Sequence, residues 1–292
     1  MAMLRAMDSA VAGLRAHQSK LDVIGHNIAN VNTYGYKSQN YSFQEAMYQT
    51  STASTGGSTN SGGVNAAQYG YGSLTGSISM DMTASTPTYL GGFNATITGQ
   101  GFFITSANNT HKVNTAGMKG IGDLEYTRVG QFSIDSNGYV VDSSGNFIYG
   151  YAGADGSAAP TGDATALQVP GNQLLTSVKL NNLGVITGVT EDGKVLTIGQ
   201  LAIATFQNPE GLTKTGGYYY QTVTGDNTGT ASASAPGQGS TPTLMAGYLE
   251  ASNVDLAKEF SEMITAQRGF QANTKMITVS DEVLNELVNM KR

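Results

Sequence analysis

The apolar positions of this chain follow one pattern at its two ends and another in its middle. Near the C-terminus, apolar residues recur at every seventh position, which is the spacing of a helix that packs along a partner. The C-terminal repeat comprises Leu256, Met263, Phe270, Ile277 and Leu284, with Phe260, Gln267, Thr274, Asp281 and Val288 at the other half of each heptad. The N-terminal repeat comprises Met7, Leu14, Leu21 and Ile28, supported by Leu4, Val11, Ile24 and Val31.

A second stripe along the N-terminal segment consists of small residues. It comprises Ala2, Ala6, Ser9, Gly13 and Ala16. Small side chains let a second helix approach closely, whereas glycine inside a helix costs about 1 kcal/mol relative to alanine. The alternative is a pair of ordinary amphipathic helices over a globular core, but such helices show a wider apolar face. We therefore expect the two terminal helices to pair with each other.

Short strands and turn residues fill the middle of the chain. Asn137-Gly138 and Asp192-Gly193 separate apolar runs and predict hairpin turns. A short helical turn is expected over residues 42–48, a flexible connector over the Gly/Ser/Thr-rich residues 51–63, and an exposed loop over residues 225–243. The first helix should end near residues 30–35, and the last should begin near Ser252 or Asn253 as N-cap.

The predicted fold class is α+β, mainly β, with a β-rich middle domain inserted between N- and C-terminal helices that pair as a coiled-coil-like domain. Residues 1–33 with 253–292 would form the terminal helical domain, residues 34–75 a connector, and residues 76–252 the β-rich domain. Whether the β-rich region is one domain or two is left open by the pattern.

Composition narrows the function classes. The chain has 292 residues, no cysteine and a net charge of -6. The absence of a basic stripe disfavours nucleic-acid binding, and no apolar run approaches the length of a membrane span. Asp8, Arg15 and Lys20 interrupt the N-terminal segment, which therefore does not resemble a secretory signal. A protein of this kind that leaves the cell would keep its N-terminus.

Residues that could carry chemistry are sparse. His17 and His26 are nine positions apart and face opposite sides of a helix, so they do not predict a metal site. Residues 99–103, GQGFF, lack the third glycine of a dinucleotide fingerprint, and tight backbone packing under aromatic rings explains them better. The Asp and Asn residues at 135–146 fit hairpin turns better than a calcium loop. We predict no catalytic, cofactor-binding or metal-binding residue and no enzyme activity.

Several ordered motifs occur along the chain. They are SAVAGL at 9–14, LDVIGHNIANVNTYGYK at 21–37, GQGFF at 99–103, YTRVG at 126–130, IGQLA at 198–202, GYLEASNVDL at 247–256 and ITAQRGFQAN at 264–273. Together they resemble motifs of the bacterial flagellar rod and hook proteins. The family more often has Asn at the position of His26 and Phe at that of Tyr36. The match covers both termini and the middle of the chain.

Within that family, residues 252–256, 268–273 and 287–289 look most like a hook protein, whereas FQNPEGL at 206–212 is similar to both hook and rod sequences. The distal rod protein is the closest rival, because hook proteins often carry a further large outer domain for which this chain has little room. Two other classes of protein fit the sequence less well. A β-rich hydrolase would need a convergent set of acidic or histidine side chains, which the sequence does not supply. An adhesin is compatible with the tyrosine-rich strands but does not explain the heptad repeats at the two ends.

The resemblance implies a structural subunit of the flagellar hook, a flexible tubular polymer that transmits torque from rod to filament. The terminal helices would line the inner tube and the β-rich domain the outer wall. The partners implied are further copies of the chain, the distal rod protein, the hook cap, the hook-filament junction proteins and the flagellar type III export apparatus. Export would place the subunit outside the cell membrane, in the hook or basal body, without cleavage of a signal peptide.

The assembly interface expected on this reading combines the two heptad stripes. It comprises Leu14, Leu21, Ile28, Leu256, Phe260, Met263, Phe270, Ile277 and Leu284.

Overall fold

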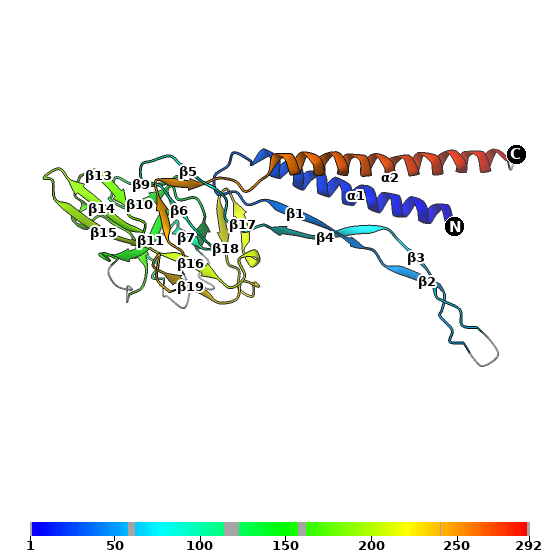
Figure 1. Ribbon diagram of the computed structural model, residues 1–292, viewed down its shortest axis with the longest axis horizontal. Helices are drawn as coiled ribbons and strands as arrows, with labels where there is room; N and C mark the ends of the chain where they lie inside the picture. The colour runs from blue at the N-terminus through cyan, green and yellow to red at the C-terminus, as the bar shows by residue number, and fades with distance from the viewer. Residues whose placement is uncertain (1, 58–61, 114–122, 157–161, 240, 291–292) are drawn as a thin grey trace. The chain divides into compact units, whose positions relative to one another are not determined.

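The computed structural model describes residues 2–57, 62–113, 123–156, 162–239 and 241–290 (Figure 1). The chain divides into two compact units, each built from segments distant in sequence. The helix–hairpin unit contains Met1–Val31, Gln39–Met80 and Val254–Arg292, and the β unit contains Asn32–Ser38 and Asp81–Asn253. The β-rich region is thus one unit.

Two long helices form the first part of the helix–hairpin unit. Helix α1 spans Ala2–Ala29 and α2 spans Leu256–Met290, and they lie side by side in Figure 1. The predicted end of the first helix near residue 30 is confirmed. The predicted N-cap of the second helix is wrong, because the carboxylate of Asp255 accepts the backbone N–H of Ala257 at 2.9 Å and caps α2 instead.

A long two-stranded ribbon completes this unit. Strand β1 (Gln39–Glu45) pairs antiparallel with β4 (Ser73–Met80), and β2 (Tyr48–Thr52) pairs with β3 (Ala67–Gly70). The helical turn expected over 42–48 is therefore wrong. Cross-strand pairing overrides local preference here, because Tyr41 faces Ile78 and Phe43 faces Thr75 along the ladder.

The expected connector at 34–75 overlaps this ribbon, most of which the structure groups with the helices. Part of the expected flexible stretch at 51–63 forms the end of β2 and a bridge between Thr55 and Val64, and residues 58–61 lie outside the described residues.

Short strands make up the β unit. They are β5 (Pro87–Tyr89), β6 (Ala95–Ile97), β7 (Phe102–Ser106), β8 (Leu124–Thr127), β9 (Phe132–Ile134), β10 (Val140–Asp142), β11 (Phe147–Ala152), β12 (Thr165–Ala166), β13 (Leu175–Leu180), β14 (Val185–Thr190), β15 (Val195–Leu201), β16 (Ile203–Phe206), β17 (Thr213–Gly216), β18 (Tyr219–Gln221), β19 (Ala231–Ser234), β20 (Leu244–Ala246) and β21 (Tyr248–Glu250). Two 3-10 turns, Pro170–Asn172 and Pro209–Gly211, join them.

One large antiparallel sheet organises these strands around a hydrophobic core. Its main path runs β13-β14-β15-β11-β7-β8-β18-β17, and β6 and β5 pair separately with β20 and β21. The core contains Phe103, Ile148, Ile186 and Leu201, all 0% exposed. A close backbone approach fixes Gly130 beside β6, since a Cβ there would lie 1.8 Å from the carbonyl oxygen of Ala95.

The two predicted hairpins are confirmed. Strands β9 and β10 flank Asn137-Gly138, and β14 and β15 flank Asp192-Gly193, whose glycines have positive φ. The exposed loop expected at 225–243 is wrong in part, because β19 pairs with β16. Ala231 and Ala233 are buried while Ser232 is exposed, so this small-residue segment alternates as a strand does.

These helices flanking a mainly β middle confirm the predicted α+β fold class.

Candidate assembly surface

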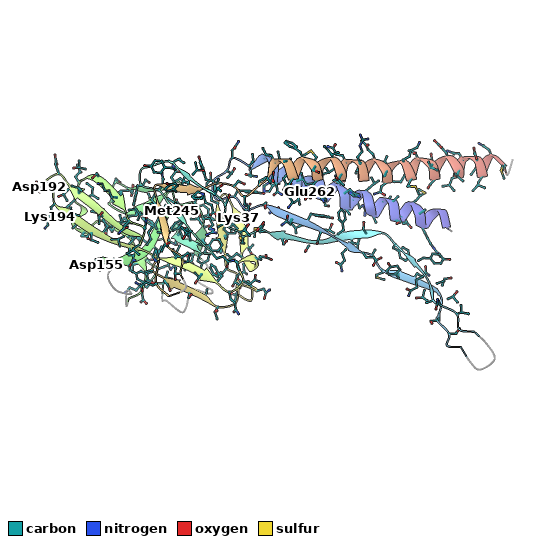
Figure 2. The ribbon with its side chains drawn as sticks, viewed as in Figure 1. Lys37, Asp155, Asp192, Lys194, Met245 and Glu262 are labelled. Atoms are coloured by element: carbon teal, nitrogen blue, oxygen red, sulfur yellow. The ribbon has the colours of Figure 1, made fainter. Side chains whose placement is uncertain are left out.

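Helices α1 and α2 run antiparallel, and side-chain bonds fix their register. Asn27 near the end of α1 donates to Glu259 in the first turn of α2, with 3.0 Å between Nδ2 and Oε1. Farther along the pair, the Lys20 ammonium lies 3.0 Å from the Glu262 carboxylate. Figure 2 shows Glu262 on α2 beside α1. Sequence segments from opposite ends of the chain thus form one helical layer.

Small residues occupy the contact between the helices. Ala10, Gly13 and Ala16 are buried on α1, as is Ala266 on α2. A Cβ added at Gly13 would lie 2.7 Å from the side-chain nitrogen of Asn273, so the helices approach too closely there for a larger residue without a shift of Asn273. The predicted close approach along the small stripe is confirmed at Gly13.

The nine residues of the expected assembly interface fall into two groups. Leu14, Leu21, Ile28, Met263, Ile277 and Leu284 are half-buried. Leu256, Phe260 and Phe270 remain exposed, with exposed fractions of 39%, 50% and 37%. Packing within one chain therefore covers the first group in part and leaves the three residues of the second group exposed.

The second half of the C-terminal heptad is shifted by one residue relative to the expected pattern. The side chains of α2 that alternate with Met263 and Ile277 toward α1 are Glu259, Ala266, Asn273 and Ser280. Gln267, Thr274 and Asp281, which were expected to form the polar half of the contact, are exposed instead. Ala266 and Ser280 are small residues, which allow a closer approach of the helices than glutamine would.

Apolar side chains that the heptad analysis missed lie uncovered on α2. They are Ile264, Met276, Val279, Val283, Leu287 and Met290. The spacing of Met276, Val279, Val283 and Leu287 is three, four and four residues, which places them on one face of a helix. This spacing is visible in the sequence, but the stronger seven-residue repeat beside it obscures the second face.

The ribbon adds a second uncovered surface. Phe43, Met47, Tyr48, Tyr69 and Leu74 are at least 43% exposed, and Glu45 is the single charged residue in the sequence between 39 and 80. Two-stranded ribbons are marginal in isolation. Among the described residues, β1 pairs only with β4 and β2 only with β3, so each of these strands presents one edge without a paired strand.

His17 lies where α1, α2 and β1 meet. Its ring centroid is 5.2 Å from that of Phe43, and a Cβ at Gly269 would lie 2.5 Å from its Cε1 atom. The Nδ1 atom is buried without a hydrogen-bond partner. Burial, and secondarily the nearby Lys20 charge, lower the pKa of His17.

Buried charges define a different environment in the β unit. The Lys37 ammonium lies 2.7 Å from Glu250 Oε1 and donates to the carbonyl of Thr83 at 2.6 Å. The Arg128 Nε atom lies 3.4 Å from Glu250 Oε2. All three side chains are at most 2% exposed. Burial lowers the pKa of Lys37, and the neighbouring Arg128 lowers it further, while Glu250 opposes both effects.

The described residues provide little that resembles a reaction centre. They contain no group of three or more His, Cys, Asp or Glu side chains able to hold a metal ion. A cavity of about 570 Å³ in the β unit is lined mainly by apolar or uncharged side chains, with Asp135 as its one ionisable residue. Among the helices of the described chain, none has an apolar stretch that could span a membrane.

The chain pairs its terminal helices around a β-rich middle and leaves apolar side chains uncovered on α2 and on the ribbon. These features are typical of a structural subunit that assembles with other chains. Comparison with protein families supports this class along most of the chain. Residues 7–37 match the flagella basal body rod protein family, residues 96–188 the flagellar hook protein FlgE/F/G D1 domain, and residues 245–290 the flagellar basal body rod FlgEFG protein C-terminal family.

Full-length relatives make the assignment definite. The flagellar basal-body rod protein FlgG of Bacillus subtilis is 39% identical over 293 residues, covering 99% of this chain and 100% of the relative. That of Caulobacter vibrioides is 29% identical and covers 96% and 97%. The flagellar hook protein FlgE of Borreliella burgdorferi is 26% identical over an alignment of 451 positions, covering 99% and 100%. The chain belongs to the family of flagellar basal-body rod and hook proteins, which is structural and not enzymatic.

Proposed function

We propose that this chain is a structural subunit of the flagellar basal-body rod, and specifically of its distal part. The observation that carries the proposal is the match in length and sequence to a rod protein, 39% identical from end to end over 293 aligned residues. The hook relative aligns over 451 positions, whereas this chain has 292 residues. The hook assignment suggested by three short motifs is therefore less well supported than the rod assignment.

Uncovered apolar surface supports polymerisation as the activity of this subunit. Leu256, Phe260 and Phe270 expose large apolar side chains along one helix, and such patches on a soluble chain mark contact sites. Further copies of the chain are the proposed occupants. The nine-residue interface expected from the heptads is retained in this proposal, extended by the second apolar face of α2 and by the ribbon.

The ribbon suits contact between identical copies. Its 42 residues carry one charge, so like-charge repulsion between copies is small. Its exposed tyrosines supply large apolar area and a polar hydroxyl. The location proposed for the polymer is the basal body outside the cytoplasmic membrane, reached through the flagellar export apparatus with an uncleaved N-terminus, and its proposed distal neighbour is the hook.

Electron microscopy of basal bodies from a strain lacking this chain tests the rod assignment. Loss of the distal rod is expected. Complete rods that lack hooks would instead support the hook assignment, and intact flagella would overturn both. Complementation with the wild-type chain controls for effects on neighbouring genes.

A charge placed on α2 tests the assembly surface. Phe270→Asp should block polymer formation, because an aspartate would be desolvated against an apolar partner. The β unit should stay folded, since Phe270 belongs to the helix–hairpin unit. The control is Gln271→Asp, which adds the same charge at an exposed polar position. Polymers of normal length from the Phe270→Asp chain, counted by electron microscopy, would remove the heptad face from the interface.

A further inference from the structure

An apolar groove flanked by two opposite charges lies inside the helix–hairpin unit. It has a volume of about 460 Å³ and runs between α1 and β4. Val11 and Ala12 of α1 and Leu74 of β4 supply its apolar lining. Asp8 and Arg15 line it on either side of Val11 and Ala12, seven residues or about 10 Å apart along α1. This α1–β4 groove therefore offers an apolar strip between one negative and one positive side chain.

Contacts between the ribbon and α1 form the groove within a single chain. The Arg5 guanidinium lies 5.3 Å from the centre of the Tyr69 ring. At Gly72, just before β4, φ is +99°, and a Cβ would lie 3.0 Å from the carbonyl oxygen of Ser9. The ribbon is thus held against α1 beside the groove. A partner would find this wall already in place, which lowers the entropy cost of binding.

The two charges of the groove are available to a partner. Asp8 and Arg15 are exposed, and neither forms an ion pair with another of the described residues. Charged groups beside an apolar contact select the partner and its register more than they add affinity. The expected occupant therefore carries a cation and an anion at the matching spacing.

The outward face of α2 carries that complementary pattern. Lys275, Val279 and Glu282 are exposed. Asn273 and Ser280 of the same helix face α1, and at about 100° per residue the three exposed side chains lie on the opposite side of α2. Lys275 and Glu282 are the one pair of opposite charges seven residues apart in the sequence of this helix.

The groove and this face match at three positions when the two helices point the same way. The pairs are Asp8 with Lys275, Ala12 with Val279, and Arg15 with Glu282. The small side chain at position 12 leaves room for the valine. A shift of seven residues in either direction would oppose like charges, Asp8 with Glu282 or Arg15 with Lys275. The charges therefore select one register among those that a heptad repeat permits.

The two helices of one chain cannot make this contact with each other. They run antiparallel, with Asn27 bonded to Glu259, whereas the three pairs require parallel helices. We propose that the α1–β4 groove of one copy receives the outward face of α2 from a second copy, with the helices parallel and an ion pair on each side of the contact between Ala12 and Val279. The docking rests on the proposed function, because it names the partner for part of the proposed assembly surface.

Charge exchange tests the ion pairs in a deletion strain that expresses variants of the chain. The measurement is the number per cell of the flagellar structures that the deletion removes, counted by electron microscopy. Asp8→Lys and Lys275→Glu should each lower this number by roughly tenfold, because like charges would face each other at every contact along the polymer. Both changes in one chain should restore the wild-type number, since each copy supplies a groove and a face.

The second ion pair repeats the test independently. Arg15→Glu and Glu282→Arg should each lower the number, and their combination should restore it. Restoration requires a folded chain, so it separates a lost contact from a failure to fold. If neither combination restored the number, the docking would be overturned.

Asp22→Lys is the matched control for Asp8→Lys. Asp22 is an exposed aspartate of α1 that does not line the groove. The change should leave the number unaltered and should not rescue Lys275→Glu. Rescue by Asp22→Lys would contradict the parallel docking, because Asp22 lies opposite Lys275 when Arg15 meets Glu282 on antiparallel helices.

A disulfide bond tests the central contact. The chain lacks cysteine, so Ala12→Cys with Val279→Cys supplies the only two thiols of each copy. Oxidation of isolated basal bodies should give disulfide-linked multimers on a non-reducing gel. The control is Ala12→Cys with Val288→Cys, at an exposed valine half a turn round α2 from Val279, and it should give monomers.

The outcomes distinguish the docking from the rod assignment. Loss of the hook in place of the rod in the deletion strain would overturn the rod assignment, whereas the exchange and disulfide tests would still report on the polymer that the chain forms. Normal rods with only monomers from Ala12→Cys with Val279→Cys would overturn the docking and leave the rod assignment in place. A disulfide to a protein of different mass would show that the occupant is not a second copy.

Discussion

The two units of this chain bury different kinds of side chain. The β unit encloses large residues completely, among them Tyr126, Tyr149 and Phe103. The buried apolar residues described in the helix–hairpin unit are Ala10, Ala16, Val23, Ile24 and Ala266, none larger than isoleucine. Most exposed large apolar side chains among the described residues also belong to this unit. One unit is folded by its own core, and the other carries a surface that suits burial against further copies.

The largest effect is expected from a cavity in the core of the β unit. Phe103→Ala should lower its free energy of unfolding by about 3–5 kcal/mol, because the ring is 0% exposed and its removal leaves a cavity. Denaturant unfolding followed by tyrosine fluorescence measures the loss. Val195→Ala, at a 66% exposed position, should change the same quantity by less than about 0.5 kcal/mol. Equal effects at both positions would contradict the core described above.

The charged cluster of the β unit should respond nearly as strongly. Glu250→Ala would leave Lys37 and Arg128 buried without their shared anion, at a cost of about 3 kcal/mol in unfolding free energy. The control is Glu262→Ala, which breaks the more exposed pair with Lys20 and should cost at most about 1 kcal/mol. If the two losses measured by denaturant unfolding were equal, burial would not set the value of these pairs.

Replacing a glycine of α1 with a larger residue should have opposite effects at a position that contacts α2 and at an open position. Gly13→Leu should destabilise the helix pair by about 1–3 kcal/mol, because its Cβ would meet Asn273 and the side chain would exceed the available space. The identical change Gly25→Leu meets nothing within 4 Å and should stabilise the helix by roughly 0.5–1 kcal/mol. Thermal melting of the helical circular dichroism signal provides the comparison. Destabilisation by both changes would argue against the assigned contact face.

The smallest expected effect is a slight loss of stability of the helix–hairpin unit in acid, caused by protonation of His17. The folded unit favours the neutral imidazole, so its contribution to stability is present above the ordinary pKa of about 6.5 and is lost as pH falls toward the lowered pKa of His17. Burial raises the pKa of Glu259 in the same unit, which acts with the opposite sign. The measurement is therefore the difference in helical melting between pH 8 and pH 5 for the wild-type chain and for His17→Gln.

The exposed His26 supplies the control for that measurement. His26→Gln should retain the pH dependence of the wild-type chain, whereas His17→Gln should reduce it. An identical pH dependence in all three chains would show that His17 does not contribute to the acid sensitivity of the helix–hairpin unit.

Local patterns in the sequence determined much of this protein. The seven-residue repeats predicted the terminal helices, Asn137-Gly138 and Asp192-Gly193 predicted hairpins that formed, and the stripe containing Gly13 predicted a close helix contact. Each of these signals depends on residues within a few turns or strands of one another. The family motifs extended the prediction to a flagellar axial subunit, but three short motifs pointed toward the hook where the full-length comparison favours the rod.

Other features depended on partners distant in sequence. The ribbon at 39–80 forms because residues of β1 pair with residues of β4 that lie 28 to 41 positions away in the sequence. Local composition does not contain this pairing and suggested a helical turn and a loose connector instead. Asp255 displaced Ser252 and Asn253 as the cap of α2, and Asn253 bonds Ser38 and Asp81 instead. The contact face of α2 is shifted by one residue from the expected heptad, to Ala266, Asn273 and Ser280, and only the packed helices reveal this shift. Periodicity determines that a helix has an apolar face, but only the packed structure decides which side of that face a given partner covers.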